Sequence, residues 1–149
     1  MPTTRRHFLL QGFISTICGL SCKIASAWSA PQFATSEFAK IYHLLVGNTE
    51  VTVSNALTIT VPDNAENGAA VPFSISSELQ DIELIYILVE KNPTPLAAQF
   101  ALSPKLLTFV SGRIKMAESC HIVVLAKQGP IWLQSQRWVN VMIGGCGTG

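Results

Sequence analysis

The chain has 149 residues, which is enough for one domain and short for two. With 48% hydrophobic and 13% charged residues and a mean hydropathy of +0.36, it is too apolar for a disordered chain. A net charge of +1, with no basic run after the N-terminus, argues against a nucleic-acid binder. Four cysteines, at spacings that match no zinc signature, argue against a zinc module or a disulfide-dense miniprotein.

Residues 1–27 have the pattern of a cleaved twin-arginine export signal. Arg5-Arg6 precedes a moderately apolar stretch that runs to about Leu20, and Ala25-Ser26-Ala27 supplies the small residues of a cleavage site. Roughly 15 apolar residues are short for a membrane anchor, which needs about 20. A lipoprotein signal through Cys22 fits less well, because glycine stands where a large aliphatic residue is preferred. We therefore expect an exported, periplasmic protein.

The mature chain is expected to begin with a short helix. Ser36 and Glu37 are residue types typical of a helix start, and Gly47 is typical of a helix end. The apolar residues between them recur at helical spacing. They are Phe38, Ile41, Tyr42 and Leu45.

After this helix the pattern changes to short strands separated by turns. Apolar and polar residues alternate over 51–61, with a break near Asn55. Further strands are expected at 71–76, 83–90, 98–102, 107–116, 121–127 and 131–143, with Pro, Gly and Asn between them. This predicts a mainly β fold, an immunoglobulin-like antiparallel β-sandwich, over residues 28–143. The Cys…Trp…Cys signature is absent, so the expected likeness is one of architecture alone.

Two tryptophans stand in the last expected strand. Trp132 and Trp138 are six residues apart, so with a period of two they face the same side, together with Gln134 and Gln136. This side either packs inside the sandwich or presents an aromatic surface to a partner.

The chain ends in a glycine-rich arm around one cysteine. The arm comprises Gly144, Gly145, Cys146, Gly147, Thr148 and Gly149. Glycine has no Cβ and wide conformational freedom, and termini are the least ordered parts of a domain. We therefore expect a flexible C-terminal arm that offers the Cys146 thiol to solvent.

The arm contains no group that would activate this thiol. A free cysteine has a pKa near 8.5, so only a few per cent is thiolate at neutral pH. A self-sufficient catalytic cysteine needs a base or a cation and a donor for the oxyanion, and residues 144–149 include no His, Lys or Arg. The pattern favours a covalent attachment point on a protein that is not itself an enzyme. The mature chain has two histidines far apart in sequence and no metal-ligand cluster, so no metal or other cofactor is expected.

Four segments of the chain form a specific set of motifs. They are residues 62–72 (PDNAENGAAVP), 92–100 (NPTPLAAQF), 113–117 (RIKMA) and 144–147 (GGCG). In sequence and in order they resemble the motifs of the SoxY family, the substrate-carrying subunit of periplasmic sulfur oxidation. Thr148-Gly149 extends the arm beyond the usual family end, and Cys120 stands where the family has no typical cysteine.

The resemblance implies that Cys146 carries thiosulfate-derived sulfur as a cysteine S-thiosulfonate. It implies a heterodimer with a small β-sandwich subunit, SoxZ, which would be exported together with this chain. It further implies that the haem enzyme SoxAX conjugates thiosulfate to the cysteine, that the dimanganese hydrolase SoxB releases sulfate, and that in some organisms the sulfur dehydrogenase SoxCD oxidises the remaining sulfur. The metals belong to these partners.

Other interpretations remain open at this level. Cys120 is expected to be a buried packing residue, but it is also a candidate redox partner for Cys146 in a thiol–disulfide oxidoreductase. Against the latter, the chain has no C-x-x-C motif and no βαβ pattern. A purely structural sandwich module is the third interpretation. The high apolar fraction predicts an apolar sheet face or edge for an obligate partner.

Overall fold

The computed structural model of this chain describes residue 33 and residues 37–103 and 106–142. The expected export signal and the arm residues 144–149 lie outside the described residues. No helix in the described ranges is both long and apolar enough to span a bilayer.

Helix α3 (Phe38–Val46) confirms the expected short helix. Its N-cap is Glu37, whose side chain makes no capping hydrogen bond and instead pairs with Lys40 at 2.7 Å. Ser36 lies outside the described residues. The helix ends at Gly47, which has a φ of +62° and donates its N–H to the carbonyl oxygen of His43 at 2.8 Å. Glycine adopts this left-handed conformation without the steric cost of a Cβ, which explains the stop.

The remaining elements are short strands and one 3-10 turn. In chain order they are β1 (Val51–Val53), β2 (Leu57–Thr60), β3 (Asn64–Ala65), η1 (Gly68–Ala70), β4 (Val71–Ser77), β5 (Ile82–Val89), β6 (Leu96–Ala101), β7 (Thr108–Ile114), β8 (Cys120–Gln128) and β9 (Ile131–Val141). The expected strands are confirmed to within a few residues, including the break near Asn55. Strand β3 and η1 were not expected, because they lie in a segment that reads as a turn.

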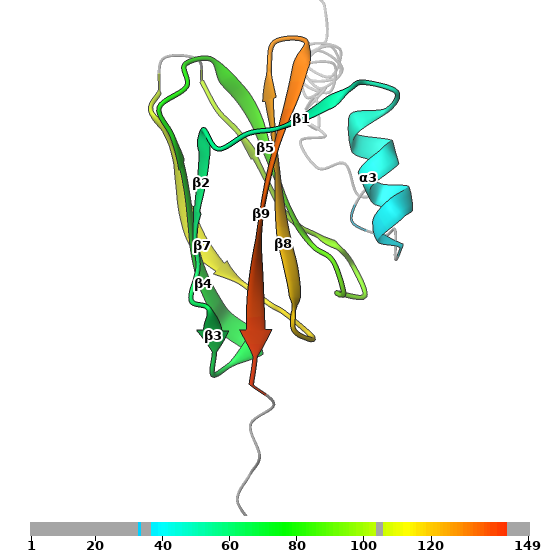
Figure 1. Cartoon of the computed structure of the whole chain (residues 1–149), viewed down its shortest axis with the longest axis vertical. Helices are drawn as coiled ribbons and strands as arrows, with labels where there is room; N and C mark the ends of the chain where they lie inside the picture. The colour runs from blue at the N-terminus through cyan, green and yellow to red at the C-terminus, as the bar shows by residue number, and fades with distance from the viewer. Residues whose placement is uncertain (1–32, 34–36, 104–105, 143–149) are drawn as a thin grey trace, which may run out of the picture.

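Two sheets form the sandwich (Figure 1). One has the strand order β1-β9-β8-β5-β6, with β3 also paired to β9, and the other has the order β2-β4-β7. The pairs among β4 to β9 are antiparallel, as expected for this fold class. The exceptions are β1 and β3, which both pair with β9 in parallel, near its two ends. Between them the chain crosses to the other sheet as β2.

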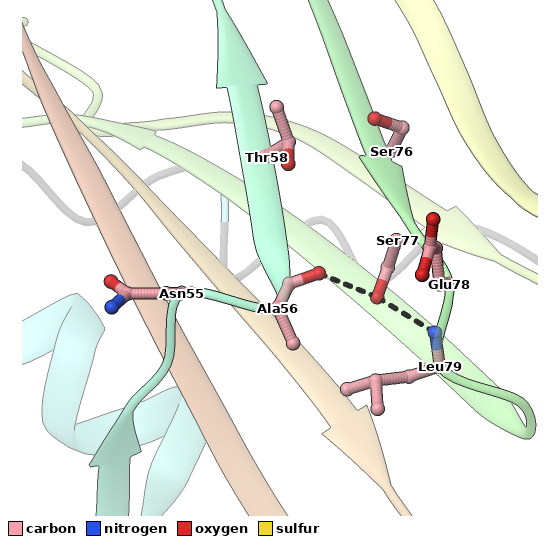
Figure 2. A pocket seen from close by; sticks show the side chains of 7 residues that line it. All are labelled: Asn55, Ala56, Thr58, Ser76, Ser77, Glu78 and Leu79. Atoms are coloured by element: carbon pink, nitrogen blue, oxygen red, sulfur yellow. Dashed lines mark hydrogen bonds between the residues drawn. The ribbon is translucent and has the colours of Figure 1, made fainter.

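A pocket of about 700 Å³ lies at one end of the smaller sheet, where β2 begins and β4 ends (Figure 2). Its lining residues are Asn55, Ala56, Thr58, Ser76, Ser77, Glu78 and Leu79. The Ser77 hydroxyl donates to the carbonyl oxygen of Ala56 at 2.8 Å and accepts the N–H of Leu79 at 3.1 Å. This hydroxyl therefore holds two loops together. Because β4 starts beside β3 and ends here, the pocket lies at the opposite end from the last residues of β9.

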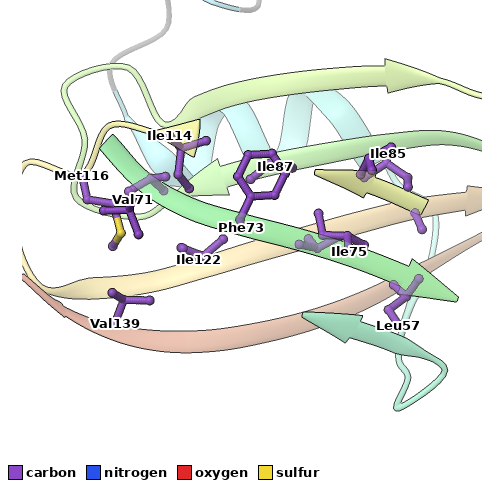
Figure 3. Packing of buried hydrophobic residues seen from close by; sticks show 14 of the residues in the cluster. Leu57, Val71, Phe73, Ile75, Ile85, Ile87, Ile114, Met116, Ile122 and Val139 are labelled. Atoms are coloured by element: carbon purple, nitrogen blue, oxygen red, sulfur yellow. The ribbon is translucent and has the colours of Figure 1, made fainter. Parts of the chain in front are cut away.

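Two apolar clusters lie on the two faces of the larger sheet. The main cluster fills the space between the sheets and includes Phe73, Ile75 and Ile87 (Figure 3). The second lies between α3 and the outer face of the same sheet. Strands β5 and β8 are covered on both faces, so residues 85–89 and 122–126 are buried without alternation. The molecule thus has three layers: the smaller sheet, the larger sheet and the helix.

Candidate functional site

The expected site residues Gly144, Gly145, Cys146, Gly147, Thr148 and Gly149 lie outside the described residues. The structure describes the base from which this arm starts, namely the last residues of β9 and the segments around them. We call this end of the sandwich the arm base. It contains residues 63–70, 115–121 and 137–142.

Strand β9 is hydrogen-bonded along both edges up to its last residue. On one side, the N–H groups of Asn140 and Met142 donate to the carbonyl oxygens of Asp63 and Ala65, both at 2.9 Å. On the other side, the N–H of Val141 donates to the hydroxyl oxygen of Ser119 at 2.8 Å. Successive N–H groups of a strand point to opposite edges, so each edge of β9 has a partner here. Hydrogen bonds therefore hold the chain on both sides as far as Met142.

The segment 62–72, the first of the motifs noted in the sequence, packs against this end of β9. Gly68 lies so close to its neighbours that a Cβ built on it would be 2.5 Å from the carbonyl oxygen of Met116 and 2.8 Å from a methyl carbon of Val141. The Gly68 carbonyl accepts the N–H of Met116 at 2.7 Å, and the Asn67 side chain accepts the N–H of Ala69 at 2.9 Å. Glycine is required at position 68 by close approach.

A second motif residue, Asn92, connects the turn after β5 to the chain after β7. Its amide nitrogen donates to the carbonyl oxygen of Lys115 at 2.7 Å, and its amide oxygen accepts the N–H of Ala117 at 2.9 Å. The segments 62–72, 92–100 and 113–117 are distant in sequence, yet these bonds bring all three to the arm base or beside it. Their common role is to hold the backbone that surrounds the end of β9.

Two exposed ion pairs lie at the arm base or beside it. Arg137 lies 3.3 Å from Asp63, and Lys91 lies 3.6 Å from Glu118. Exposed pairs of this kind contribute little stability, about 0–1 kcal/mol each. Within the described ranges, no group of three or more His, Cys, Asp or Glu side chains is placed to hold a metal ion.

Cys120, the other cysteine of the expected mature chain, lies in the sandwich core. It is the first residue of β8, pairs with Val139 of β9 and is 0% exposed. Burial raises the pKa of its thiol above the usual value, and a backbone hydrogen bond at Lys91 offsets part of this increase. The expectation of a buried packing cysteine is confirmed. Full burial of the Cys120 thiol disfavours the oxidoreductase interpretation, which needs an accessible pair of thiols.

The two tryptophans share one sheet face, as expected, but their environments differ. Trp132 is buried under α3 and stacks on Tyr86, with ring centroids 5.7 Å apart. Trp138 is 44% exposed, and its ring meets that of His121 edge to face. Sequence periodicity indicated that the two side chains share a face, but it did not indicate which end of β9 the helix covers. Nothing in the sequence singled out Ser119.

Replacing Gly68 with alanine is expected to lower the free energy of unfolding by about 1–3 kcal/mol, because the new methyl group overlaps backbone atoms that cannot move independently. The matched control is Gly112→Ala, whose Cβ would meet only the Phe73 ring, at 3.2 Å, and is expected to cost under about 1 kcal/mol. Urea unfolding of both variants measures the difference. Equal costs would contradict the close-packed arm base.

Cys120 is expected to resist alkylation in the folded mature protein. The thiol is buried and its pKa is raised, so the reactive thiolate is scarce at pH 8 and a local opening is needed first. Its reaction with iodoacetamide should be on the order of a hundredfold slower than in urea. Peptide mass spectrometry of native and denatured samples measures both rates. Equally fast native labelling of Cys120 would show that its place in the core is wrong.

The region of this chain that matches a known family includes the arm base and Cys146. The model of the family described as sulfur oxidation protein SoxY matches residues 42–146. A search of the curated proteins found no match. Among solved structures, this chain is similar to that of the sulfur carrier protein SoxY from Chlorobium limicola f thiosulfatophilum, with 30% sequence identity and a TM-score of 0.65 over 72% of this chain and 98% of that chain. The chain therefore belongs to the SoxY family.

Proposed function

We propose that this chain is a carrier of sulfur intermediates, which it holds covalently on Cys146 and presents to the enzymes of sulfur oxidation. The observation that supports this most is the extent of the family match, which runs through the described strands and ends on Cys146. The similar structure from Chlorobium limicola f thiosulfatophilum is that of a sulfur carrier protein. A carrier needs its cysteine on an arm that starts from a well-held part of the fold. The hydrogen bonds of Asn140, Val141 and Met142 support this, because they hold the chain just before the arm.

In the proposed loading step, a bond forms between the Cys146 sulfur and the outer sulfur of thiosulfate. The thiol loses its proton, and two electrons leave to the haem-containing enzyme, so the product is a cysteine S-thiosulfonate. In the next step, water attacks the terminal sulfonate sulfur and the bond between the two outer sulfurs breaks. Sulfate leaves, and a persulfide remains on Cys146. The chain contributes the thiol in both steps, while the partners supply the redox and hydrolytic chemistry.

A covalent tether explains why a separate carrier subunit is useful here. Sulfane intermediates are kept from diffusing away, and each enzyme meets its substrate at a high effective concentration on the same handle. Cys146 lies five residues beyond Val141, the last residue of β9. An extended chain of this length reaches about 17 Å. This is enough to bring a sulfur into a recessed catalytic centre while the sandwich stays outside.

The proposed partners follow from family membership. They are a SoxZ-like subunit, the haem-containing conjugating enzyme SoxAX, the dimanganese hydrolase SoxB and, for the remaining sulfane, the sulfur dehydrogenase SoxCD. The proposed location is the periplasm, with export by the twin-arginine pathway and cleavage after Ala27. The pattern of residues 1–27 supports this location.

The carrier role predicts that Cys146→Ser abolishes loading and Cys120→Ala does not. Mature protein bound to its SoxZ-like subunit is incubated with the haem enzyme, thiosulfate and an oxidised electron acceptor. Intact-mass spectrometry then measures the gain of one thiosulfate group. The Cys120→Ala control removes the other thiol of the mature chain and creates only a small void, so it should load at the wild-type level.

An adduct that persists in Cys146→Ser would contradict the proposal, as would a wild-type chain that never gains mass while the enzyme remains active. An adduct lost only in Cys120→Ala would instead point to chemistry on the buried thiol. Thermal unfolding of both variants shows that each is folded before loading is measured.

A further inference from the structure

The outer face of the larger sheet is only half covered by α3. Near the start of β9, Trp132 and its neighbours are buried beneath the helix. Toward the end of β9 the same face is open to solvent. There, Trp138 is 44% exposed and Met142 is 58% exposed. Trp138 is six residues from Trp132 within β9, so both belong to one face of the sheet, and Met142 directly follows the strand. An exposed aromatic and an exposed thioether thus lie beside the origin of the arm.

Trp138 is held in one orientation although it is exposed. Its indole N–H donates to the side-chain oxygen of Asn140 at 2.8 Å, and the amide nitrogen of Asn140 donates in turn to the side-chain oxygen of Asn64 at 3.2 Å. The ring of His121 packs against the indole with centroids 4.9 Å apart and planes at 78°. The His121 ring is itself 3.3 Å from the Glu90 carboxylate. A side chain fixed in this way loses little conformational freedom when a partner covers it.

A pocket lies between α3 and the part of this face that carries His121. His121 is shared, because it contacts Trp138 and also lines this pocket of about 360 Å³ beside Phe38 and Tyr42. The polar lining of this pocket includes Gln134 and Gln136 of β9. A protein surface that rested on Trp138 would therefore find room for a side chain next to it.

The length of the chain beyond β9 limits where an enzyme can lie when it acts on Cys146. The α-carbon of Cys146 is at most about 17 Å from that of Val141, and Trp138 is three residues, or about 10 Å, before Val141 along the strand. An enzyme group that contacts the Cys146 sulfur therefore lies within about 20 Å of Val141, and the rim of its channel lies nearer to the arm base by the depth of that channel. Each added ångström of depth brings the rim closer.

We propose that Trp138, oriented by His121 and Asn140, is the surface on which an enzyme seats the rim of its channel while it acts on the carried sulfur. This inference rests on the proposed carrier function and adds a docking residue to it. Trp is the residue type most enriched among binding hot spots, especially where it is pre-oriented. The occupant is the enzyme that takes up the arm, because an enzyme holding Cys146 lies within reach of this ring.

The test is the rate at which the haem-containing enzyme conjugates thiosulfate, with the intact heterodimer as the varied substrate. Trp138→Ala is expected to raise KM for the carrier about tenfold, the usual scale for a hot spot, with kcat unchanged because the reacting atoms are not touched. Trp138→Phe keeps a ring against His121 and should recover most of the affinity. The matched control is Ile131→Ala, which removes a side chain that is 46% exposed at the opposite end of the same strand.

The KM and three further measurements, namely Cys146 labelling, size-exclusion chromatography and wild-type loading, separate the possible outcomes. Labelling of Cys146 by a small thiol reagent should be equal in Trp138→Ala and wild type, since the arm is unaltered. Wild-type KM in Trp138→Ala would overturn the docking role. Loss of the heterodimer in size-exclusion chromatography would also overturn it, because the ring would then belong to the subunit interface. Failure of the wild-type chain to load at all would count against the carrier function, whatever the effect of Trp138.

Discussion

The hydrogen bonds on both edges of β9, continued to its last residue, are the constraint on which the rest of the structure depends. The N–H groups of Asn140 and Met142 are bound on one side, and that of Val141 is bound by Ser119 on the other. Loss of these hydrogen bonds would lengthen the unpaired segment before Cys146 by several residues. Hydrogen bonds hold the chain as far as Met142, and Cys146 follows four residues later in the sequence.

The segments that resemble family motifs acquire a physical meaning from this constraint. Gly68 allows the backbone of one segment to touch the carbonyl oxygen of Met116 and the side chain of Val141. Asn92 bonds two backbone groups of another segment. Each of these residues maintains the backbone around the end of β9. The second thiol, Cys120, is sequestered in the core with its pKa raised, which leaves the proposed chemistry to the cysteine of the arm.

Much of the fold could be predicted from the sequence because local patterns determine it. Alternation identified the strands within residues 51–61, turn residues marked the limits of the later strands, and Gly47 identified the end of α3. The sheet partners could not be predicted, since parallel pairing of β1 and β3 with β9 depends on contacts far apart in sequence. For the same reason, periodicity placed Trp132 and Trp138 on one face without showing which one the helix covers. Ser119 has no sequence signal, because any loop hydroxyl could have filled its role.

The central claim, that Cys146 bears the sulfur, is tested most directly on the protein as cells make it. The mature chain would be purified without reductant from cells oxidising thiosulfate, and its C-terminal peptide characterised by tandem mass spectrometry. The account predicts sulfane or thiosulfonate adducts on Cys146 that disappear after treatment with a reductant, with Cys120 unmodified. A C-terminal peptide free of adducts in such cells, or adducts confined to Cys120, would contradict it.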